Sequence, residues 1–154
     1  MQFLCDAMLG RLTTWLRLLG HDTVYSGAGD HELARKSRAE DRILLTRDAQ
    51  LAGRRGIRAL LIVSDDPQDQ LRQVVHRFRL APTRALPRCP VCNTPLRGLP
   101  RPAAKERVPA YVYEHHTTFR ECPACGKVYW RGSHWQRIQS TLESLDAEDG
   151  IYRC

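Results

Sequence analysis

The sequence contains no long apolar segment. None of its runs approaches the roughly 20 apolar residues that a helix needs to cross a membrane. Asp6 interrupts the first apolar stretch, at a point where a secretory signal peptide continues with apolar residues. We therefore expect no membrane partner and a cytoplasmic location.

Lysine is scarce as well. Lys36, Lys105 and Lys127 are the only lysines among the 24 basic residues, and all the others are arginines. The planar guanidinium group of arginine suits hydrogen bonding to phosphate groups and to base edges. A general preference of the genome for arginine would give the same composition, so the arginines alone do not identify a partner.

Acidic residues are few in one part of the chain. Residues 81–137 carry 10 basic and 3 acidic side chains, whereas residues 1–80 carry 13 and 10, and residues 138–154 carry 1 and 4. The 154 residues together have a net charge of +7, which favours polyanionic partners. The hydrophobic fraction of 42% is typical of a folded globular protein and too high for a disordered one.

Four of the six cysteines form two Cys-x-x-Cys pairs, which are separated by 29 residues and consist of Cys89, Cys92, Cys122 and Cys125. Each such turn brings two sulfur atoms to one point, so two facing turns supply the four thiolates of a tetrahedral zinc site. A redox motif would need one pair at the start of a helix, and it does not explain two. Because four thiolates leave no open position for a substrate, we expect a structural zinc ion.

The first 80 residues alternate between strand and helix patterns. Short β-prone runs are found at residues 2–5, 22–25, 42–46 and 59–63. Leucines spaced for one face of a helix follow the first run, and Asp66 and Pro67 form a helix start after the fourth. Because the third and fourth runs are apolar throughout, this pattern predicts an α/β domain with a small parallel sheet covered by helices on both faces.

The remainder of the chain predicts a smaller module. We expect the α/β domain at residues 1–80, a linker with Pro82 and Pro87 at 81–88, a zinc ribbon plus C-terminal helix at 89–145, and an acidic tail at 146–154. Within the ribbon, residues 108–113 and 127–130 are β-prone. Ser133 is a suitable cap for the last helix, whose apolar positions are Trp135, Ile138, Leu142 and Leu145.

Aspartates follow the predicted strands. Asp6 comes directly after the first strand, Asp48 lies two residues beyond the third, and Asp30 enters the helix after the second. Functional groups in an open α/β sheet gather at the carboxyl ends of the strands, where Asp65 and Asp66 are also expected. Carboxylates that converge there repel one another unless cations neutralise them, and they suit Mg²⁺ or Mn²⁺. Such a site supports metal-dependent hydrolysis of phosphodiester bonds.

A helix-capping role is the alternative for several of these aspartates. Asp30, Asp48 and Asp66 each precede a helix, and aspartate is a favoured N-cap. For Asp66, next to Pro67, we favour the cap. Asp6 is the hardest to explain in this way, because two residues separate it from the leucine stripe. Asp22 and Asp41 precede strands at the opposite edge, so we expect them to be turn residues.

Taken together, these motifs resemble the PIN-like ribonuclease domain that occurs at the C-terminus of the Mutator-seven exonuclease and as a stand-alone prokaryotic protein. The resemblance covers residues 1 to about 145. It rests on Phe3-Leu-Cys-Asp6 with Met8-Leu-Gly-Arg-Leu12, Trp15-Leu-Arg-Leu-Leu-Gly20-His-Asp22, Asp30-His-Glu-Leu33, Arg42-Ile-Leu-Leu-Thr-Arg-Asp48, the two cysteine turns and Tyr129-Trp-Arg-Gly-Ser-His134. It implies that Asp6, Asp30 and Asp48 are the catalytic residues that bind a divalent ion, and that the protein cleaves RNA. Cys5 stands where an aliphatic residue is expected, and a small buried cysteine fits the same space.

Three functions remain open at this stage. The first is an Mg²⁺- or Mn²⁺-dependent ribonuclease whose arginine-rich ribbon holds RNA through Arg97, Arg101, Arg107, Arg120 and Arg131. The second is a non-catalytic protein that binds RNA or a ribosome-like assembly, and the third, which we rank lowest, is a phosphoryl-transfer or receiver-type domain. The aromatic residues Tyr111, Tyr113, Tyr129, Trp130 and Trp135 are either stacking platforms for unpaired bases or the core of the ribbon. His115, His116 and His134 are further candidates for contacts with phosphate or metal. The sequence makes no prediction of oligomeric state.

Overall fold

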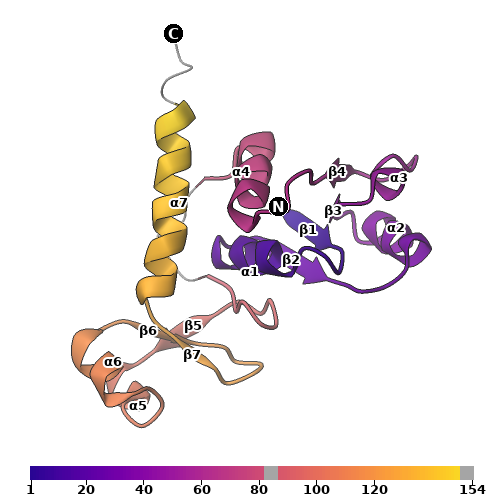
Figure 1. Cartoon of the computed structure of the whole chain (residues 1–154). Coiled ribbons are helices and arrows are strands. Elements are labelled where there is room, and N and C mark those ends of the chain that lie inside the picture. Colours follow the sequence, from indigo (N-terminus) through magenta and orange to yellow (C-terminus); the bar gives the residue numbers. More distant parts are fainter. Residues whose placement is uncertain (82–86, 150–154) are drawn as a thin grey trace.

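The computed structural model describes residues 1–81 and 87–149, and its first half is built on a parallel sheet (Figure 1). The strands are β1 (Gln2–Cys5), β2 (Asp22–Tyr25), β3 (Ile43–Thr46) and β4 (Ala59–Leu61), in the spatial order β2-β1-β3-β4. All three pairings between neighbouring strands are parallel. The α/β class and the four strands predicted from the sequence are therefore confirmed.

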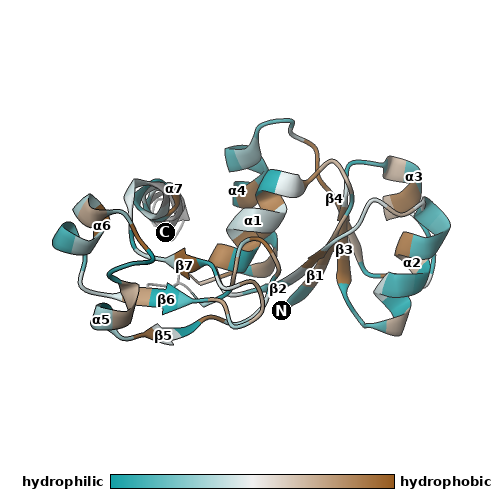
Figure 2. Ribbon diagram, turned by 90° about the horizontal axis from the view of Figure 1, so that it is seen from below, coloured by the Kyte–Doolittle hydropathy of each residue, from teal (hydrophilic) through white to brown (hydrophobic). Residues whose placement is uncertain are grey.

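Helices cover both faces of this sheet (Figure 2). The helices α1 (Gly10–Leu18) and α4 (Pro67–Phe78) lie on one face, and α2 (Asp30–Ala39) and the short α3 (Ala49–Ala52) lie on the other. Successive side chains of a strand point to opposite faces. Accordingly, Phe3 and Cys5 pack with α1 and α4, whereas Leu4 packs with α2 and α3.

The start of α4 follows the expected capping pattern. The carboxylate of Asp66 accepts hydrogen bonds from the backbone N–H groups of Gln68 and Asp69, at 2.8 and 3.1 Å. Pro67 occupies the first helical position, where no N–H donor is needed. The capping role that we favoured for Asp66 is thus confirmed.

The cysteine-containing half forms a second, antiparallel sheet. Its strands are β5 (Arg97–Leu99), β6 (Phe119–Glu121) and β7 (Val128–Tyr129), in the order β5-β6-β7, and the short helices α5 (Arg101–Ala104) and α6 (Ala110–His115) connect β5 to β6. The strand expected at 127–130 is present as β7. The strand expected at 108–113 is wrong, because α6 occupies most of this segment and buries Val112 together with Val108 against Leu99 and Phe119.

The last helix, α7 (Ser133–Asp149), begins at Ser133 as expected and continues four residues beyond the predicted end at 145. Trp135 and Ile138 are buried against the first half of the chain. Residues 82–86, which include Pro82 of the predicted linker, and residues 150–154 of the predicted acidic tail lie outside the described part. No helix among the described residues is long and apolar enough to cross a membrane.

One hydrophobic core joins the two halves of the chain. The cluster beneath α1 and α4 includes Phe3 and Leu16 and continues through Cys89, Cys122 and Trp135. The module of the second sheet therefore packs directly against the domain of the parallel sheet.

Candidate metal centre and acidic site

Four cysteine side chains meet between the two Cys-x-x-Cys turns. Their Sγ atoms all lie within 4.8 Å of one another. The Sγ atom of Cys89 is 3.8 Å from that of Cys125, and the Sγ atom of Cys92 is 3.3 Å from that of Cys122. Thiolates at about 2.3 Å from a tetrahedral zinc ion would be about 3.8 Å apart. The sulfur atoms thus have nearly the spacing of a zinc site.

The two turns have the same backbone structure. In the first, the N–H group of Asn93 donates to the carbonyl of Cys89, and in the second the N–H group of Gly126 donates to the carbonyl of Cys122, both at 2.9 Å. Asn93 and Gly126 have φ angles of 67° and 74°. Asparagine and glycine adopt this left-handed conformation more readily than other residues.

The chemistry of this cluster fits zinc. Cys89 and Cys122 are buried, and none of the four cysteines is in a disulfide bond. The hydroxyl oxygen of Tyr129 lies 3.1 Å from Cys89 Sγ, where it can donate a hydrogen bond to a thiolate. Four thiolates would fill the coordination sphere of zinc, so the four cysteines could hold a zinc ion whose role is structural.

A buried arginine attaches the first cysteine turn to the parallel sheet. The Nε atom of Arg17 donates to the carbonyl of Thr23, and its Nη1 atom donates to the carbonyls of Pro90 and Val91, each at 2.9 Å. Pro90 and Val91 are the two residues between Cys89 and Cys92. The position of the candidate zinc site relative to the sheet is therefore fixed by side-chain contacts.

The carboxylate of Asp6 is buried at the carboxyl end of β1. Its Oδ1 atom accepts a hydrogen bond from the N–H group of Met8 at 3.0 Å. Its Oδ2 atom accepts one from the Thr46 hydroxyl at 2.5 Å and one from the N–H group of Arg47 at 3.2 Å. Asp6 is only 9% exposed, and no salt bridge to it occurs among residues 1–81 and 87–149. Neutral donors alone thus hold this carboxylate.

Thr46 connects Asp6 to Asp48. The Oγ1 atom of Thr46 donates to Asp6 and accepts a hydrogen bond from the N–H group of Asp48 at 3.0 Å. The Oδ1 atom of Asp48 accepts from the N–H group of Leu51 at 2.9 Å, so Asp48 also caps α3. The capping alternative is therefore confirmed for Asp48, and the Thr46 hydroxyl group connects the backbone N–H group of Asp48 with the Asp6 carboxylate.

The residue between them, Arg47, has an unusual environment. Its guanidinium group forms an ion pair with the exposed carboxylate of Asp65, which follows β4. The Nε atom of Arg47 is buried and has no hydrogen-bond partner in the described part of the chain. The backbone N–H group of Arg47 thus donates to Asp6, while its guanidinium group pairs with Asp65 and has unused hydrogen-bonding capacity.

Asp30 lies apart from this pair. It is the first residue of α2, its side chain is 49% exposed, and its Oδ2 atom is 3.9 Å from an Nη2 atom of Arg54. Within the described ranges, the cysteine cluster is the one group of three or more potential ligands with closely spaced ligand atoms. The structure links the Asp6 carboxylate to the backbone of Asp48 through Thr46, and the described residues show no tight ligand set that joins Asp30 to them.

At the opposite edge of the sheet, Asp41 is a turn residue as expected, but the same expectation is wrong for Asp22, which is the first residue of β2. Asp22 pairs with Arg42 at 2.9 Å and accepts a hydrogen bond from Asn93 at 2.6 Å. Burial acts to raise the pKa of Asp22, but the hydrogen bonds from Arg42 and Asn93 outweigh it and hold the pKa below its usual value. Asp41, in a left-handed conformation, pairs with Arg58.

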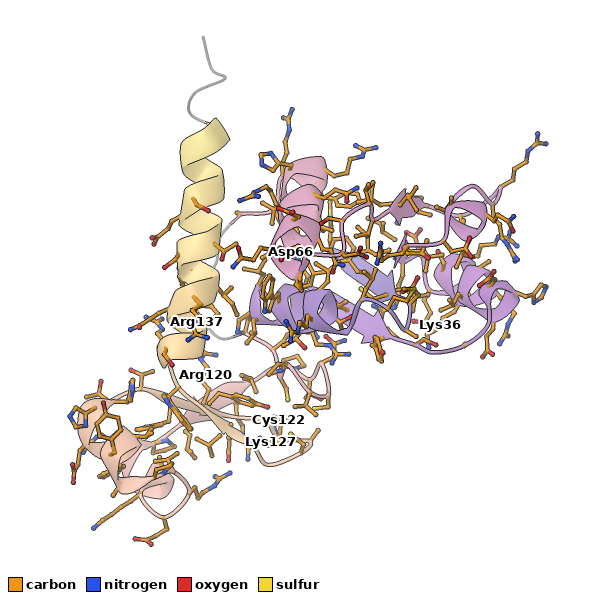
Figure 3. All side chains as sticks on the ribbon, viewed as in Figure 1. Lys36, Asp66, Arg120, Cys122, Lys127 and Arg137 are labelled. Atoms are coloured by element: carbon orange, nitrogen blue, oxygen red, sulfur yellow. The ribbon has the colours of Figure 1, made fainter. Side chains whose placement is uncertain are left out.

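The five arginines expected to contact RNA differ in their surroundings. Arg97 and Arg107 share the carboxylate of Glu121, at 2.7 and 2.6 Å, and their hydrogen bonds lower the pKa of Glu121. Arg101 lies over the ring of Tyr113. Arg120 is half-buried and Arg131 is exposed. Figure 3 shows Arg120, Cys122 and Lys127 on the antiparallel module.

Most aromatic residues of this module belong to its core. Trp135 is buried, while Tyr113, Tyr129 and Trp130 are partly buried against apolar clusters. Tyr111 is exposed, and its ring is 4.2 Å from that of His115. The core interpretation therefore holds for four of the five aromatic residues. The side chain of His134 lies outside the described part.

Sequence reasoning did not single out Thr46, Arg17 or Asn93 as functional residues. For Thr46 a signal was available, because it begins the Thr-Arg-Asp motif that contributes to the resemblance. Arg17 and Asn93 act on segments about 70 residues away in the sequence, so nothing local identifies their role.

Comparison with known families agrees with this geometry. The family model of the Mut7-C RNAse domain matches residues 1–142, which include both the acidic edge and the four cysteines. Searches of curated proteins and of solved structures found no match. The match covers nearly the whole chain, and the chain belongs to the Mut7-C RNAse domain family.

Proposed function

We propose that the chain is a ribonuclease that hydrolyses phosphodiester bonds of RNA with the help of Mg²⁺ or Mn²⁺. The family supplies the class of activity. The observation that carries the proposal is the pair of Asp6 and Asp48 at the carboxyl edge of the sheet, linked through Thr46. The Asp6 carboxylate is buried, neutral donors hold it, and it has no ionic partner among the described residues, so a divalent ion would be its first counter-charge.

The residues have distinct roles in this proposal. Asp6 and Asp48 would hold the divalent ion, which supplies an activated water molecule and charge neutralisation at the phosphate. Thr46 orients the Asp6 carboxylate, and its hydrogen bond with the N–H group of Asp48 fixes the backbone of Asp48 relative to that carboxylate. Arg47 would bind a phosphate oxygen through its guanidinium group, in exchange for its ion pair with the exposed Asp65. Asp30 would be a third acidic ligand, reached through rotation of its exposed side chain.

The same proposal assigns a role to each segment of the chain. Residues 1–80 would form the nuclease domain, 81–88 the connection, and 89–145 the zinc ribbon and helix that assist RNA binding, followed by an acidic tail at 146–154. Of the arginines assigned to RNA, Arg120 and Arg131 are the stronger candidates. Arg97 and Arg107 would first have to release Glu121.

The test is cleavage of a labelled RNA by the Asp6→Asn variant in Mn²⁺. Asparagine keeps the shape of the side chain and removes its charge, so we expect loss of cleavage in a folded protein. The matched control is Asp41→Asn, which removes the same charge at the opposite edge and suits the left-handed backbone there.

A folded and fully active Asp6→Asn protein would remove Asp6 from the mechanism. The competing function, a non-catalytic RNA-binding protein, predicts that the wild-type chain binds RNA but does not cleave it. Calorimetric titration of Mn²⁺ into the zinc-loaded protein separates the two, because only the nuclease needs a saturable site that Asp6→Asn abolishes.

A further inference from the structure

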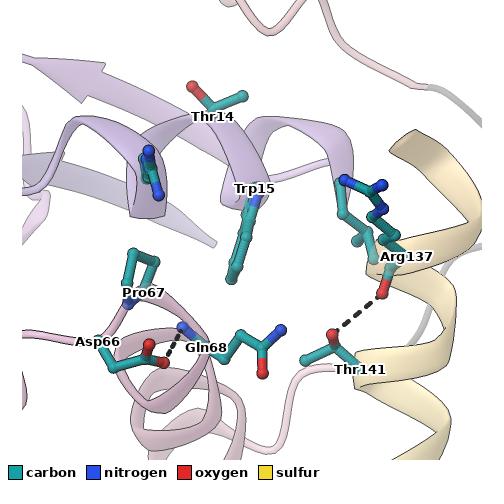
Figure 4. Close-up of a pocket in the computed structure, with 9 residues that line it drawn as sticks. Thr14, Trp15, Asp66, Pro67, Gln68, Arg137 and Thr141 are labelled. Carbon is teal, nitrogen blue, oxygen red and sulfur yellow. Dashed lines mark hydrogen bonds between the residues drawn. The ribbon is translucent and has the colours of Figure 1, made fainter. Parts of the chain in front are cut away.

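A groove of about 490 Å³ lies between α1, the first turn of α4 and α7 (Figure 4). Arg11, Thr14 and Trp15 line it from α1, and Arg137 and Thr141 line it from α7. In Figure 4 the ring of Trp15 points from α1 into the space between α4 and α7. The groove thus combines a half-buried aromatic ring with two guanidinium groups.

The charges in this groove are not balanced. Arg11 and Arg137 are exposed, and neither forms an ion pair within residues 1–81 and 87–149. The one acidic residue of the lining is Asp66, whose carboxylate already accepts two hydrogen bonds from the first turn of α4. By contrast, Arg97 and Arg107 on the ribbon are paired with Glu121. The lining therefore carries a net positive charge, and its two guanidinium groups have no ion-pair partner in the described part of the chain.

Two further hollows share lining residues with the groove. One of about 400 Å³ shares Thr14 with it and is lined by Trp130 of the ribbon. The other, of about 500 Å³, shares Arg137 and Thr141 and is lined by hydroxyl groups of α7, including that of Ser140. Aromatic, cationic and hydroxyl groups therefore line neighbouring hollows between the ribbon, α1 and α7.

One end of the groove lies toward the acidic edge of the parallel sheet. The helices α1 and α4 start where β1 and β4 end, and Arg11 follows Asp6 by five residues. We propose that the groove binds single-stranded RNA, with a base stacked on Trp15 and phosphate groups bound by Arg11 and Arg137. This inference rests on the proposed function, because the bound strand is the one that reaches Asp6 and Asp48.

Single-stranded RNA fits this groove better than a duplex. Sequence-tolerant binding of single strands combines a cationic groove with aromatic side chains on which bases stack. In a duplex the faces of the bases are covered by their neighbours and are not free to contact Trp15. The guanidinium groups of Arg11 and Arg137 would bind phosphate groups, and the ring of Trp15 would stack on an unpaired base.

The experiment measures the affinity for a short labelled RNA by fluorescence anisotropy, with Ca²⁺ in place of Mn²⁺, across a salt series. For Arg11→Gln/Arg137→Gln we expect weaker binding and a slope of log affinity against log salt that is less negative by roughly 1.4, because each phosphate contact contributes about 0.7. The matched control is Arg35→Gln/Arg55→Gln, which removes the same charge from exposed positions on the other side of the sheet. Equal losses in the two double variants would overturn the inference.

Trp15 has a separate test. Trp15→Leu keeps apolar contact with the core but removes the ring, so we expect roughly tenfold weaker binding of single-stranded RNA, while Trp15→Phe retains most of the affinity. For an abasic oligomer of the same length, Trp15→Leu should bind as the wild type does. Loss of affinity for both oligomers alike would contradict stacking on Trp15.

The outcomes for the groove and for the nuclease are distinguishable. If Asp6→Asn abolishes cleavage while Arg11→Gln/Arg137→Gln binds RNA as the wild type does, the proposal of RNA binding in the groove is contradicted and the proposal of ribonuclease activity is supported. If the groove variants lose binding but the wild-type protein cleaves no RNA in Mn²⁺, the proposed ribonuclease activity fails and the RNA groove stands.

Discussion

At the scale of single residues, the acidic site depends on a hydroxyl group as much as on its carboxylates. Thr46 is fully buried, and its Oγ1 atom both donates to Asp6 and accepts from the N–H group of Asp48. Aspartates in separate segments are thereby held in a common arrangement before any cation binds.

Thr46→Val tests this role. Valine has nearly the shape of threonine but cannot form either hydrogen bond, so Asp6 loses its shortest donor. We expect the free energy of unfolding to fall by about 1–3 kcal/mol, the usual cost of an unsatisfied buried polar group, together with loss of RNA cleavage. Urea denaturation and a cleavage assay measure the two effects.

Thr46→Ser is the control, because serine retains the hydroxyl group and should keep both activity and most of the stability. A Thr46→Val protein that cleaves RNA at the wild-type rate would show that Asp6 and Asp48 do not need this link.

We expect His21 to make the free energy of unfolding depend on pH. Burial lowers the pKa of His21 from its usual 6.5 to about 4, with smaller contributions from the N-terminal amine and Arg88. Between these values the unfolded chain binds a proton that the folded chain does not, so stability falls as the pH falls from 6.5 to 4. The slope from this one group is limited to about 1.4 kcal/mol per pH unit.

The measurement is urea unfolding of the zinc-loaded protein at a series of pH values. His21→Leu should flatten the profile below pH 6.5 relative to the wild type. The other titrating groups are the same in both proteins, so the difference between their profiles reports on His21. Parallel profiles for His21→Leu and the wild type would contradict the prediction.

How far the sequence predicts the site depends on where each partner lies. The place of Asp6 follows from its position directly after a strand, and the cysteine cluster follows from spacing alone. The separation of Asp30 from these residues does not follow from its position in the sequence. The packing of Leu33 and Ala34 sets the rotation of α2 about its axis and the path of the loop before it. Such long-range packing has no local signature in the sequence.

At the scale of elements, the contact between the first cysteine turn and the parallel sheet determines how the two halves of the chain are arranged. Arg17 of α1 holds the carbonyls of Pro90 and Val91, and Asn93 forms hydrogen bonds with Asp22 and with the N–H group of Thr23. Because these residues flank or lie within the turn, the contact also shapes the zinc site.

Arg17→Lys tests this contact. The lysine side chain has a single nitrogen atom, so it cannot donate to Thr23 and to the cysteine turn at the same time, as the guanidinium group of Arg17 does. We expect a loss of about 1.5–3 kcal/mol in stability, typical of a hydrogen bond from a charged donor, and weaker zinc binding in a chelator competition. The exposed Arg35→Lys is the control. Unchanged zinc affinity in Arg17→Lys would mean that the ribbon forms its site without the sheet.

The elements of the first half were predictable, and those of the second were only partly so. β-Prone runs identified all four parallel strands, of which β3 is buried along its whole length in a sheet covered on both faces. In the ribbon, the same reasoning failed at residues 108–113, where Val108 and Val112 are four residues apart and face one core along a helix. The strands β5 and β6 have three residues each, too few to show a period.

At the scale of the whole molecule, the hydrophobic core and the candidate zinc site are parts of one structure. The cluster that contains Phe3 and Leu16 also contains Cys89 and Cys122. The second cluster of the parallel sheet, around Leu4 and Leu44 under α2 and α3, has no residue from the ribbon. Loss of zinc should therefore affect the two faces of the parallel sheet differently.

The prediction is one zinc ion per chain in the wild-type protein and less in Cys122→Ser, measured by metal analysis. Structural zinc can contribute apparent binding energies of about 10–16 kcal/mol, so its loss should unfold the ribbon. In hydrogen exchange we expect the amides of β6 to lose protection first and those of α1 to lose part of it, because α1 packs on the shared cluster. The amides of α2 should change least, because its partners lie on the far face. Cys5→Ala, which alters a buried cysteine outside the cluster, should retain the zinc ion and the protection of β6. If Cys122→Ser kept full protection of β6, the fold of the ribbon would not depend on the metal, and the four cysteines would need another explanation.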